Sequence, residues 1–261
     1  MTGRVAAISR PAGVADGARP PRSVVPLLVG VAVLAWVVAV LGELGGEAAL
    51  LHHHALIDNG PPLIVAVPLF LVGWHVMVVG MMIPGSLPAI TAFERLAGQH
   101  PHRPRAMGGF LIAYLLVWTA FGLVAFAGDV ALHTFVDAMP WLAGRSWLIE
   151  AGVVALAGAY QFAPMKRQSL AACRHPRGVG GVVSSGVAAG TAHALDCLGS
   201  SWALMLLMFA AGFASLWWMA GLTAVMVYEA RGRHGQQAAK SVGTILLGLA
   251  VYAVAGGGLP A

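Results

Sequence analysis

The feature that most constrains this fold is a series of long apolar runs, each close to the roughly 20 residues that a helix needs to cross a bilayer. Only 10% of the 261 residues are charged, whereas a soluble domain carries about 25%. The runs are continuous rather than alternating, which is typical of membrane helices. We predict an all-α, polytopic transmembrane bundle of about seven spans, roughly at residues 24–43, 63–84, 108–128, 147–164, 181–210, 212–229 and 241–258.

The basic residues mark one side of this predicted bundle. Every Lys and Arg except Arg145 lies in the N-terminal tail or in the loops after the second, fourth and sixth spans. Because such residues gather on the cytoplasmic side, we expect the N-terminus inside and the C-terminus outside. Residues 1–22 are then a disordered cytosolic tail, and 23–258 form a single transmembrane domain. The formal net charge of +5 is a topology signal, so we expect no nucleic-acid partner.

The division of residues 181–229 into two predicted spans stays open, because no charged loop separates them.

The most unusual stretch is 190–212, in which polar and ionisable residues interrupt an apolar helix. Such residues are costly in hydrocarbon and by default mark a functional site. On a helix, His193, Cys197 and Ser200 or Ser201 share one face, with Asp196 beside it. Imidazole, thiolate and carboxylate together suit zinc or copper, and thioether sulfur favours Cu(I). A buried polar network without a metal is the alternative.

The second span offers further ligands at a matching depth. His75 lies roughly 12 residues into this span, near the middle of the membrane. Met77 and Met81 follow it one turn apart, and Pro84 and Pro88 are expected to end the span. We therefore predict a metal site between spans two and five, with the candidate ligands His193, Cys197, His75, Asp196, Met77, Met81 and Met205.

Three smaller features add to this hypothesis. Cys173 near one membrane face, and the outer triplet His52, His53 and His54, are candidates for metal uptake or release. If the spans are right, Cys173 and Cys197 differ in depth by about half a membrane, so a disulfide between them is not expected. Gly186 and Gly190 form a GxxxG pair of the kind that lets helices pack closely.

Motifs of hydrolases, metalloproteases and nucleotide-binding enzymes are absent from the sequence, so no catalytic residue is predicted.

Three motifs occur in order between Leu63 and Ala230. They are W-x-x-M-x-x-x-M-M-x-P from Trp74, A-G-x-Y-Q-x-x-P-x-K from Ala157 with C-R-x-P from Cys173, and a cysteine-containing helix leading into W-x-L-M at Trp202. Together they resemble a bacterial domain-of-unknown-function family of predicted metal-binding integral membrane proteins, some of them labelled copper chaperones. The resemblance implies a multi-pass protein of the bacterial inner (cytoplasmic) membrane that handles copper, with zinc as the second choice of metal.

The chain departs from that family at its cysteines. Ser200 and Ser201 stand where a C-x-G-C-C-W pattern is expected, and Ser169 stands where a further cysteine is expected. The chain therefore resembles a cysteine-depleted member. Either histidine, aspartate and methionine side chains hold the metal instead, or the scaffold persists without it.

The leading hypothesis is a membrane protein that binds a transition metal, most readily copper, and hands it to a metal chaperone or to another membrane protein. Two alternatives stay open. The chain could be a non-metal structural or accessory subunit that packs through its glycine face. It could also be a proton-coupled transporter that uses Asp196 and His193 as a relay.

Overall fold

The computed structural model describes residues 23–45, 61–98, 102–145, 147–174, 186–211 and 216–256. Within these ranges the regular structure is entirely helical, which confirms the all-α prediction for them. The helices are α1 (Val25–Gly45), α3 (Leu63–Ala97), α4 (Arg103–Asp137), α5 (Pro140–Ala143), α6 (Trp147–Tyr160), α7 (Pro164–Arg174), α8 (Gly186–Ala211), α9 (Leu216–Arg231) and α10 (Gly235–Gly256).

Four of these helices, α1, α3, α4 and α10, are long and apolar enough to cross a membrane. The pair α6 and α7 forms a fifth candidate if both belong to one span, although they are bent by 65° at the break between them. Large apolar side chains such as Leu27, Ile64 and Val124 are exposed on the outside of the bundle, as lipid contact requires. The prediction of a membrane-spanning helical protein is confirmed at this level.

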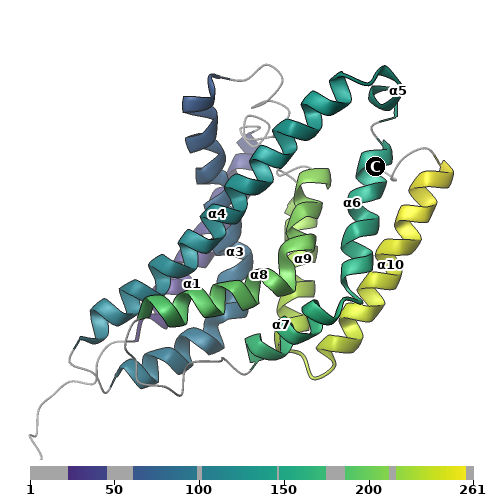
Figure 1. Cartoon of the computed structure of the whole chain (residues 1–261). Coiled ribbons are helices and arrows are strands. Elements are labelled where there is room, and N and C mark those ends of the chain that lie inside the picture. The colour runs from purple at the N-terminus through teal and green to yellow at the C-terminus, as the bar shows by residue number, and fades with distance from the viewer. Residues whose placement is uncertain are drawn as a thin grey trace, which may run out of the picture.

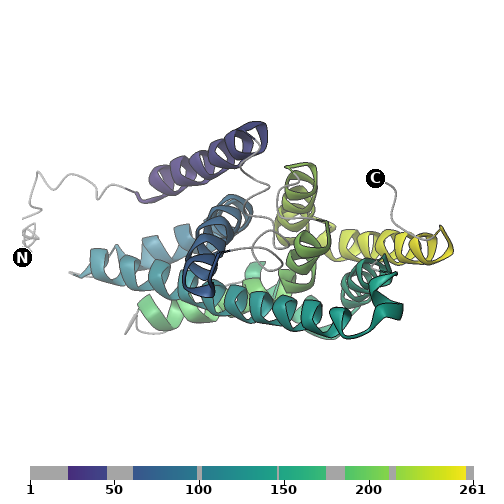
Figure 2. The same cartoon turned by 90° about the horizontal axis from the view of Figure 1, so that it is seen from above.

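The bundle is built around α3 and α4. Figure 2 shows α1 at one edge of the molecule, beside α3, and α10 at another, beside α6. The two helices α3 and α4 run antiparallel, because Ser86 contacts Tyr114 while Trp74, earlier in α3, bonds to the carbonyl of Trp118. In Figure 1, α8 lies alongside the first half of α4, whereas α6, α9 and α10 stand more upright.

Pro84 and Pro88, which we predicted to end the second span, do not end the helix. Helix α3 continues through both prolines to Ala97. A proline inside a helix removes one N–H and frees the carbonyl four residues earlier. For Pro84 that carbonyl belongs to Gly80, and it accepts a hydrogen bond from the indole Nε1 of Trp36 on α1 at 3.2 Å. A neighbouring helix thus satisfies the freed group, which allows the helix to continue.

One carboxylate joins the ends of three helices. Glu94, near the end of α3, accepts hydrogen bonds from the Ser23 hydroxyl at 2.7 Å and from the Val24 N–H at 2.8 Å, both just before α1. It also forms an ion pair with Arg103 at the start of α4, with N and O 2.6 Å apart. The start of α1, the end of α3 and the start of α4 therefore lie on the same side of the bundle.

The most extensive contact between two helices is that of α4 with α8. A methyl group at Gly186 would collide with the backbone carbonyl of Ala106, and one at Gly190 would collide with that of Phe110. The two helices run parallel here, since both contact pairs advance by four residues. Without side chains at the two glycines, the backbones approach closely and the next turns of each helix are brought into register.

We expect Gly190→Ala to lower the free energy of unfolding by about 1–3 kcal/mol, because the added methyl group must push α8 away from the Phe110 backbone. Thermal unfolding of the detergent-solubilised protein measures this. Gly108→Ala is the matched control, since a methyl group there meets nothing within 4 Å and alanine favours the helix. Equal unfolding temperatures for the two variants would contradict the close α4–α8 contact.

Candidate metal site

The candidate site lies where α8 packs against α3, α4 and α7. Four polar residues of α8, His193, Cys197, Ser200 and Ser201, are buried, and none is more than 8% exposed. They share one helix face because His193, Ser200 and Ser201 each lie three or four residues from Cys197. The residues that sequence periodicity places together thus face the interior of the bundle.

Cys197 is surrounded by groups from two other helices. Its Sγ lies 3.9 Å from the Sδ of Met82 on α3 and 3.4 Å from the hydroxyl of Tyr114 on α4. That hydroxyl is in turn 3.2 Å from the hydroxyl of Ser86, and Ser201 donates to the Met82 sulfur at 3.8 Å. These five residues, the Cys197 cluster, bring a thiol, a thioether and three hydroxyls together in a buried space.

His193 lies one helical turn before Cys197 on the same face. Its ring stacks on Phe110 and Tyr114, with centroids 5.9 and 5.7 Å away. The Nε2 atom is buried and has no hydrogen-bond partner within the part of the chain that the structure describes. Because a buried polar atom left without a partner costs free energy, it calls for an explanation. A metal ion bound to this nitrogen would supply the missing partner.

Hydroxyls stand around Cys197 where the resemblance suggests thiols. Ser200 and Ser201 each donate a hydrogen bond to the Cys197 carbonyl at 2.8 Å. Ser169 of α7 packs on Gly199, where an added methyl group would collide with its hydroxyl. Ser200 and Ser201 therefore flank Cys197, whereas Ser169 lies against Gly199. These three hydroxyls stand at the positions where the resemblance implies thiols.

Cys173 also belongs to this region. It is half-buried on α7, and its Sγ lies 3.9 Å from the Ser200 hydroxyl. The expectation that Cys173 and Cys197 differ in depth by half a membrane is therefore wrong. The chain bends by 65° after α6, and α7 then packs along α8, as Figure 1 shows. Sequence spacing contains no sign of this bend.

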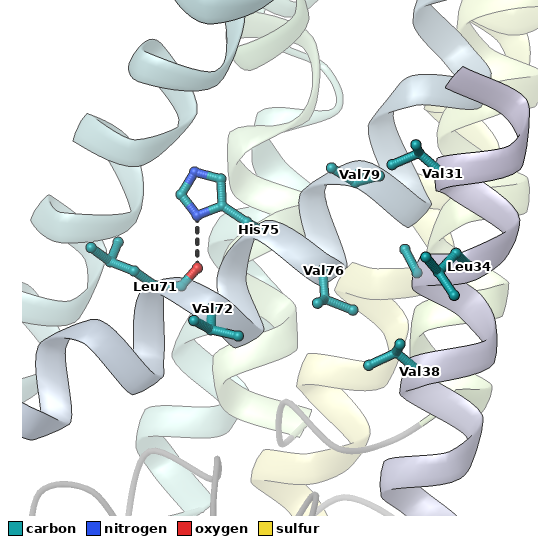
Figure 3. Close-up of a pocket in the computed structure, with 9 residues that line it drawn as sticks. Val31, Leu34, Val38, Leu71, Val72, His75, Val76 and Val79 are labelled. Carbon is teal, nitrogen blue, oxygen red and sulfur yellow. Dashed lines mark hydrogen bonds between the residues drawn. The ribbon is translucent and has the colours of Figure 1, made fainter. Parts of the chain in front are cut away.

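His75 makes different contacts. Its Nδ1 lies 2.7 Å from the Leu71 carbonyl and its Nε2 lies 2.9 Å from the Thr119 hydroxyl, so both ring nitrogens have partners. Figure 3 shows this imidazole beside a groove of about 480 Å³ between α1 and α3, whose other walls are apolar. The structure gives no contact between His75 and the Cys197 cluster, so its predicted role as a ligand stays a prediction.

The remaining predicted ligands divide into three groups. Met77, Met81 and Met205 are buried in the hydrophobic core. Asp196 is half-buried next to Cys197 on α8. The triplet His52, His53 and His54 lies outside the described residues. Among the residues that the structure describes, no three His, Cys, Asp or Glu side chains are placed to hold one metal ion.

A buried ion pair was missed by sequence reasoning. Lys166 Nζ on α7 lies 2.6 Å from Glu229 Oε2 on α9, and both side chains are 1% exposed. Beside α7, the hydroxyl of Tyr160 donates to the Gly199 carbonyl at 2.6 Å. The ion pair holds α7 against α9, and the Tyr160 bond holds the end of α6 against α8. Because α7 follows α6 after the bend, it packs against α8 with Cys173 near Ser200. Charge pattern alone indicated only that Lys166 lies near a membrane surface.

Comparison with known proteins identifies the family of the chain. The sequence model of the PpoB2 family, described as a copper chaperone, matches residues 71–253. This range contains every member of the Cys197 cluster, as well as His193 and Cys173. No curated protein and no solved structure matches the chain. The family resemblance inferred from the three sequence motifs is confirmed.

The buried ion pair allows a stability test. Lys166→Met leaves the Glu229 carboxylate buried without its lysine, so we expect the unfolding free energy to fall by about 3–5 kcal/mol. The double variant Lys166→Met/Glu229→Leu replaces both charges with apolar groups and should recover most of that loss. Thermal unfolding in detergent compares the three proteins. A double variant that is less stable than either single variant would disprove this account of the pair.

Proposed function

Because the chain belongs to a copper chaperone family, we propose that it binds Cu(I) at the Cys197 cluster within the bilayer and passes it on. The observation that supports this most strongly is the 3.9 Å contact between Cys197 Sγ and Met82 Sδ. His193, whose buried Nε2 has no partner among the described residues, lies one helical turn before Cys197 on the same face. A thiol, a thioether and an imidazole from two helices would then bind one ion.

The chemistry of these groups favours copper over zinc. Thiolate and thioether sulfur are soft ligands that select Cu(I), whereas zinc sites use thiolate, imidazole and carboxylate. A metal–sulfur bond is about 2.3 Å long. The observed separation of 3.9 Å is less than twice that length, so both sulfurs can reach one ion without movement of either helix. Zinc remains the second choice, with Asp196 in place of the thioether.

The surrounding residues support binding and release. A cysteine must lose its proton to bind a metal, and the Tyr114 hydroxyl at 3.4 Å can donate a hydrogen bond to the resulting thiolate. The stacked Phe110 and Tyr114 rings fix the His193 imidazole in one orientation. Asp196, beside Cys197, would be either a further ligand or a partner that orients His193. The apolar walls keep water away from the site.

We assign Cys173 to the uptake or release of copper. Its thiol is half-buried rather than buried, and its Sγ lies 3.9 Å from the hydroxyl of Ser200, which is itself bonded to the Cys197 carbonyl. An ion leaving Cys197 would therefore meet this second sulfur at the edge of the bundle. The receiving partner would be a soluble metal chaperone or a second membrane protein.

We further propose seven spans in the bacterial inner membrane, with the N-terminus inside. Two contacts support this arrangement. Glu94 gathers the start of α1, the end of α3 and the start of α4 on one side, and the Lys166–Glu229 pair joins α7 to the end of α9. The basic residues cluster in these same parts of the sequence, which agrees with a cytoplasmic location for them.

Copper affinity tests the proposed site. We expect Cys197→Ser and Met82→Leu each to lower Cu(I) affinity at least tenfold, a loss of about 1.4 kcal/mol, because each removes one sulfur ligand. Competition with a colorimetric Cu(I) chelator on purified protein measures the affinity. Met81→Leu is the matched control, since Met81 is also buried on α3 but is not part of the Cys197 cluster.

A rescue variant separates ligand loss from misfolding. Ser201 contacts Met82 through its hydroxyl at 3.8 Å, so Ser201→Cys in the Cys197→Ser background restores a thiol beside the same thioether and should recover part of the affinity. Cu(I) affinity that is equal in the wild-type protein and in Cys197→Ser would refute the site. A loss with Met81→Leu as large as that with Met82→Leu would refute the proposed ligand set.

A further inference from the structure

Methionine is distributed unevenly between the inside and the outside of the bundle. Every methionine of α3, α4, α8 and α9 belongs to the buried core. Over all the residues that the structure describes, the large apolar side chains exposed on the surface are mostly leucine, valine and isoleucine. The exposed methionines among them are Met139 and Met165, and both lie outside these four helices.

Hydrophobicity does not account for this division. Lipid tails are as apolar as leucine, so a membrane protein gains little by sorting methionine from leucine according to polarity. Two properties of methionine remain: its flexibility, which fills irregular gaps, and its thioether, which binds Cu(I). The order of the methionines along α8 and α3 favours the second property.

On α8 the buried face continues past the Cys197 cluster. Ser201 is followed at intervals of four and three residues by Met205 and Met208, which are both 0% exposed. Residues three or four apart on a helix are roughly 5–6 Å apart at their Cβ atoms. The long side chains of Met205 and Met208 can therefore approach one another and the sulfur of Met82, which already contacts Ser201.

Helix α3 supplies more thioethers at the same level. It runs antiparallel to α4, as the Ser86–Tyr114 and Trp74–Trp118 contacts show, whereas α8 runs parallel to α4. It follows that α3 and α8 are antiparallel. The residues before Met82 on α3 thus accompany those after Ser201 on α8. Met77 lies five positions before Met82, at about the level of Met205.

We propose that Met82, Met205 and Met208 form a thioether path along which Cu(I) moves from Cys197 toward the C-terminal end of α8. This inference rests on the proposed copper site and adds movement through the bundle to binding. Each step between methionines exchanges one neutral thioether for another, and ligand exchange throughout leaves the copper as Cu(I), with no electron transferred. When the Cys197 thiolate releases the ion, it takes up one proton.

Purified protein in liposomes separates movement from binding. Cu(I), kept reduced outside the vesicles, is detected by a Cu(I)-responsive dye inside. We expect Met205→Leu/Met208→Leu to keep its Cu(I) affinity within twofold of wild type, while flux falls at least tenfold, because leucine preserves the packing volume but lacks sulfur. Met107→Leu is the control, because Met107 is equally buried but lies on α4 near the start of α8, and it should retain full flux.

Two further variants complete the test. Met208→Cys in the double variant returns a sulfur ligand and should restore part of the flux. Flux in Met205→Leu/Met208→Leu equal to that of wild type, or no protein-dependent flux in wild type, would overturn the path. The copper site is judged separately by Cys197→Ser: if this variant loses affinity while the leucine double variant carries copper normally, the site stands and the path is rejected.

Discussion

The close contact between α4 and α8 is the interaction on which the candidate site depends. Gly186 and Gly190 leave room for the Ala106 and Phe110 backbones, and this sets the register of the following turns. Phe110 and Tyr114 then stack on His193, and the Tyr114 hydroxyl reaches Cys197. Because lipid supplies no hydrophobic force between membrane helices, such close backbone packing is what makes a precise site possible.

Around this contact, α3 and α7 contribute further groups, and each of these helices is held by a polar bond. Helix α3 brings Met82, and its own course past Pro84 depends on Trp36 bonding to the Gly80 carbonyl. Helix α7 brings Cys173 and is held by the buried Lys166–Glu229 pair. Buried charges are costly unless paired, so this ion pair makes the position of α7 specific. The site is accordingly an outcome of four helices rather than of one motif.

Sequence reasoning predicted what depends on periodicity and apolar length: the helices, their membrane character, the buried face of α8 from His193 to Met205, and the family. It failed where the outcome depends on contacts between distant segments. Pro84 does not end α3, because a partner on α1 satisfies the freed carbonyl. Cys173 lies near Cys197, because α7 folds back along α8. Among the methionines, only the packing of α3 on α8 distinguishes Met82, which contacts Cys197, from its neighbour Met81, which sequence reasoning favoured.

The central claim is that Cys197, Met82 and His193 together hold Cu(I). X-ray absorption at the copper K-edge of the Cu(I)-loaded protein tests it most directly, because sulfur and nitrogen neighbours scatter differently. We expect a Cu(I) edge with two sulfur neighbours and one nitrogen neighbour, and one sulfur neighbour fewer in Met82→Leu. A first shell of nitrogen and oxygen alone, or a spectrum unchanged in Met82→Leu, would contradict it.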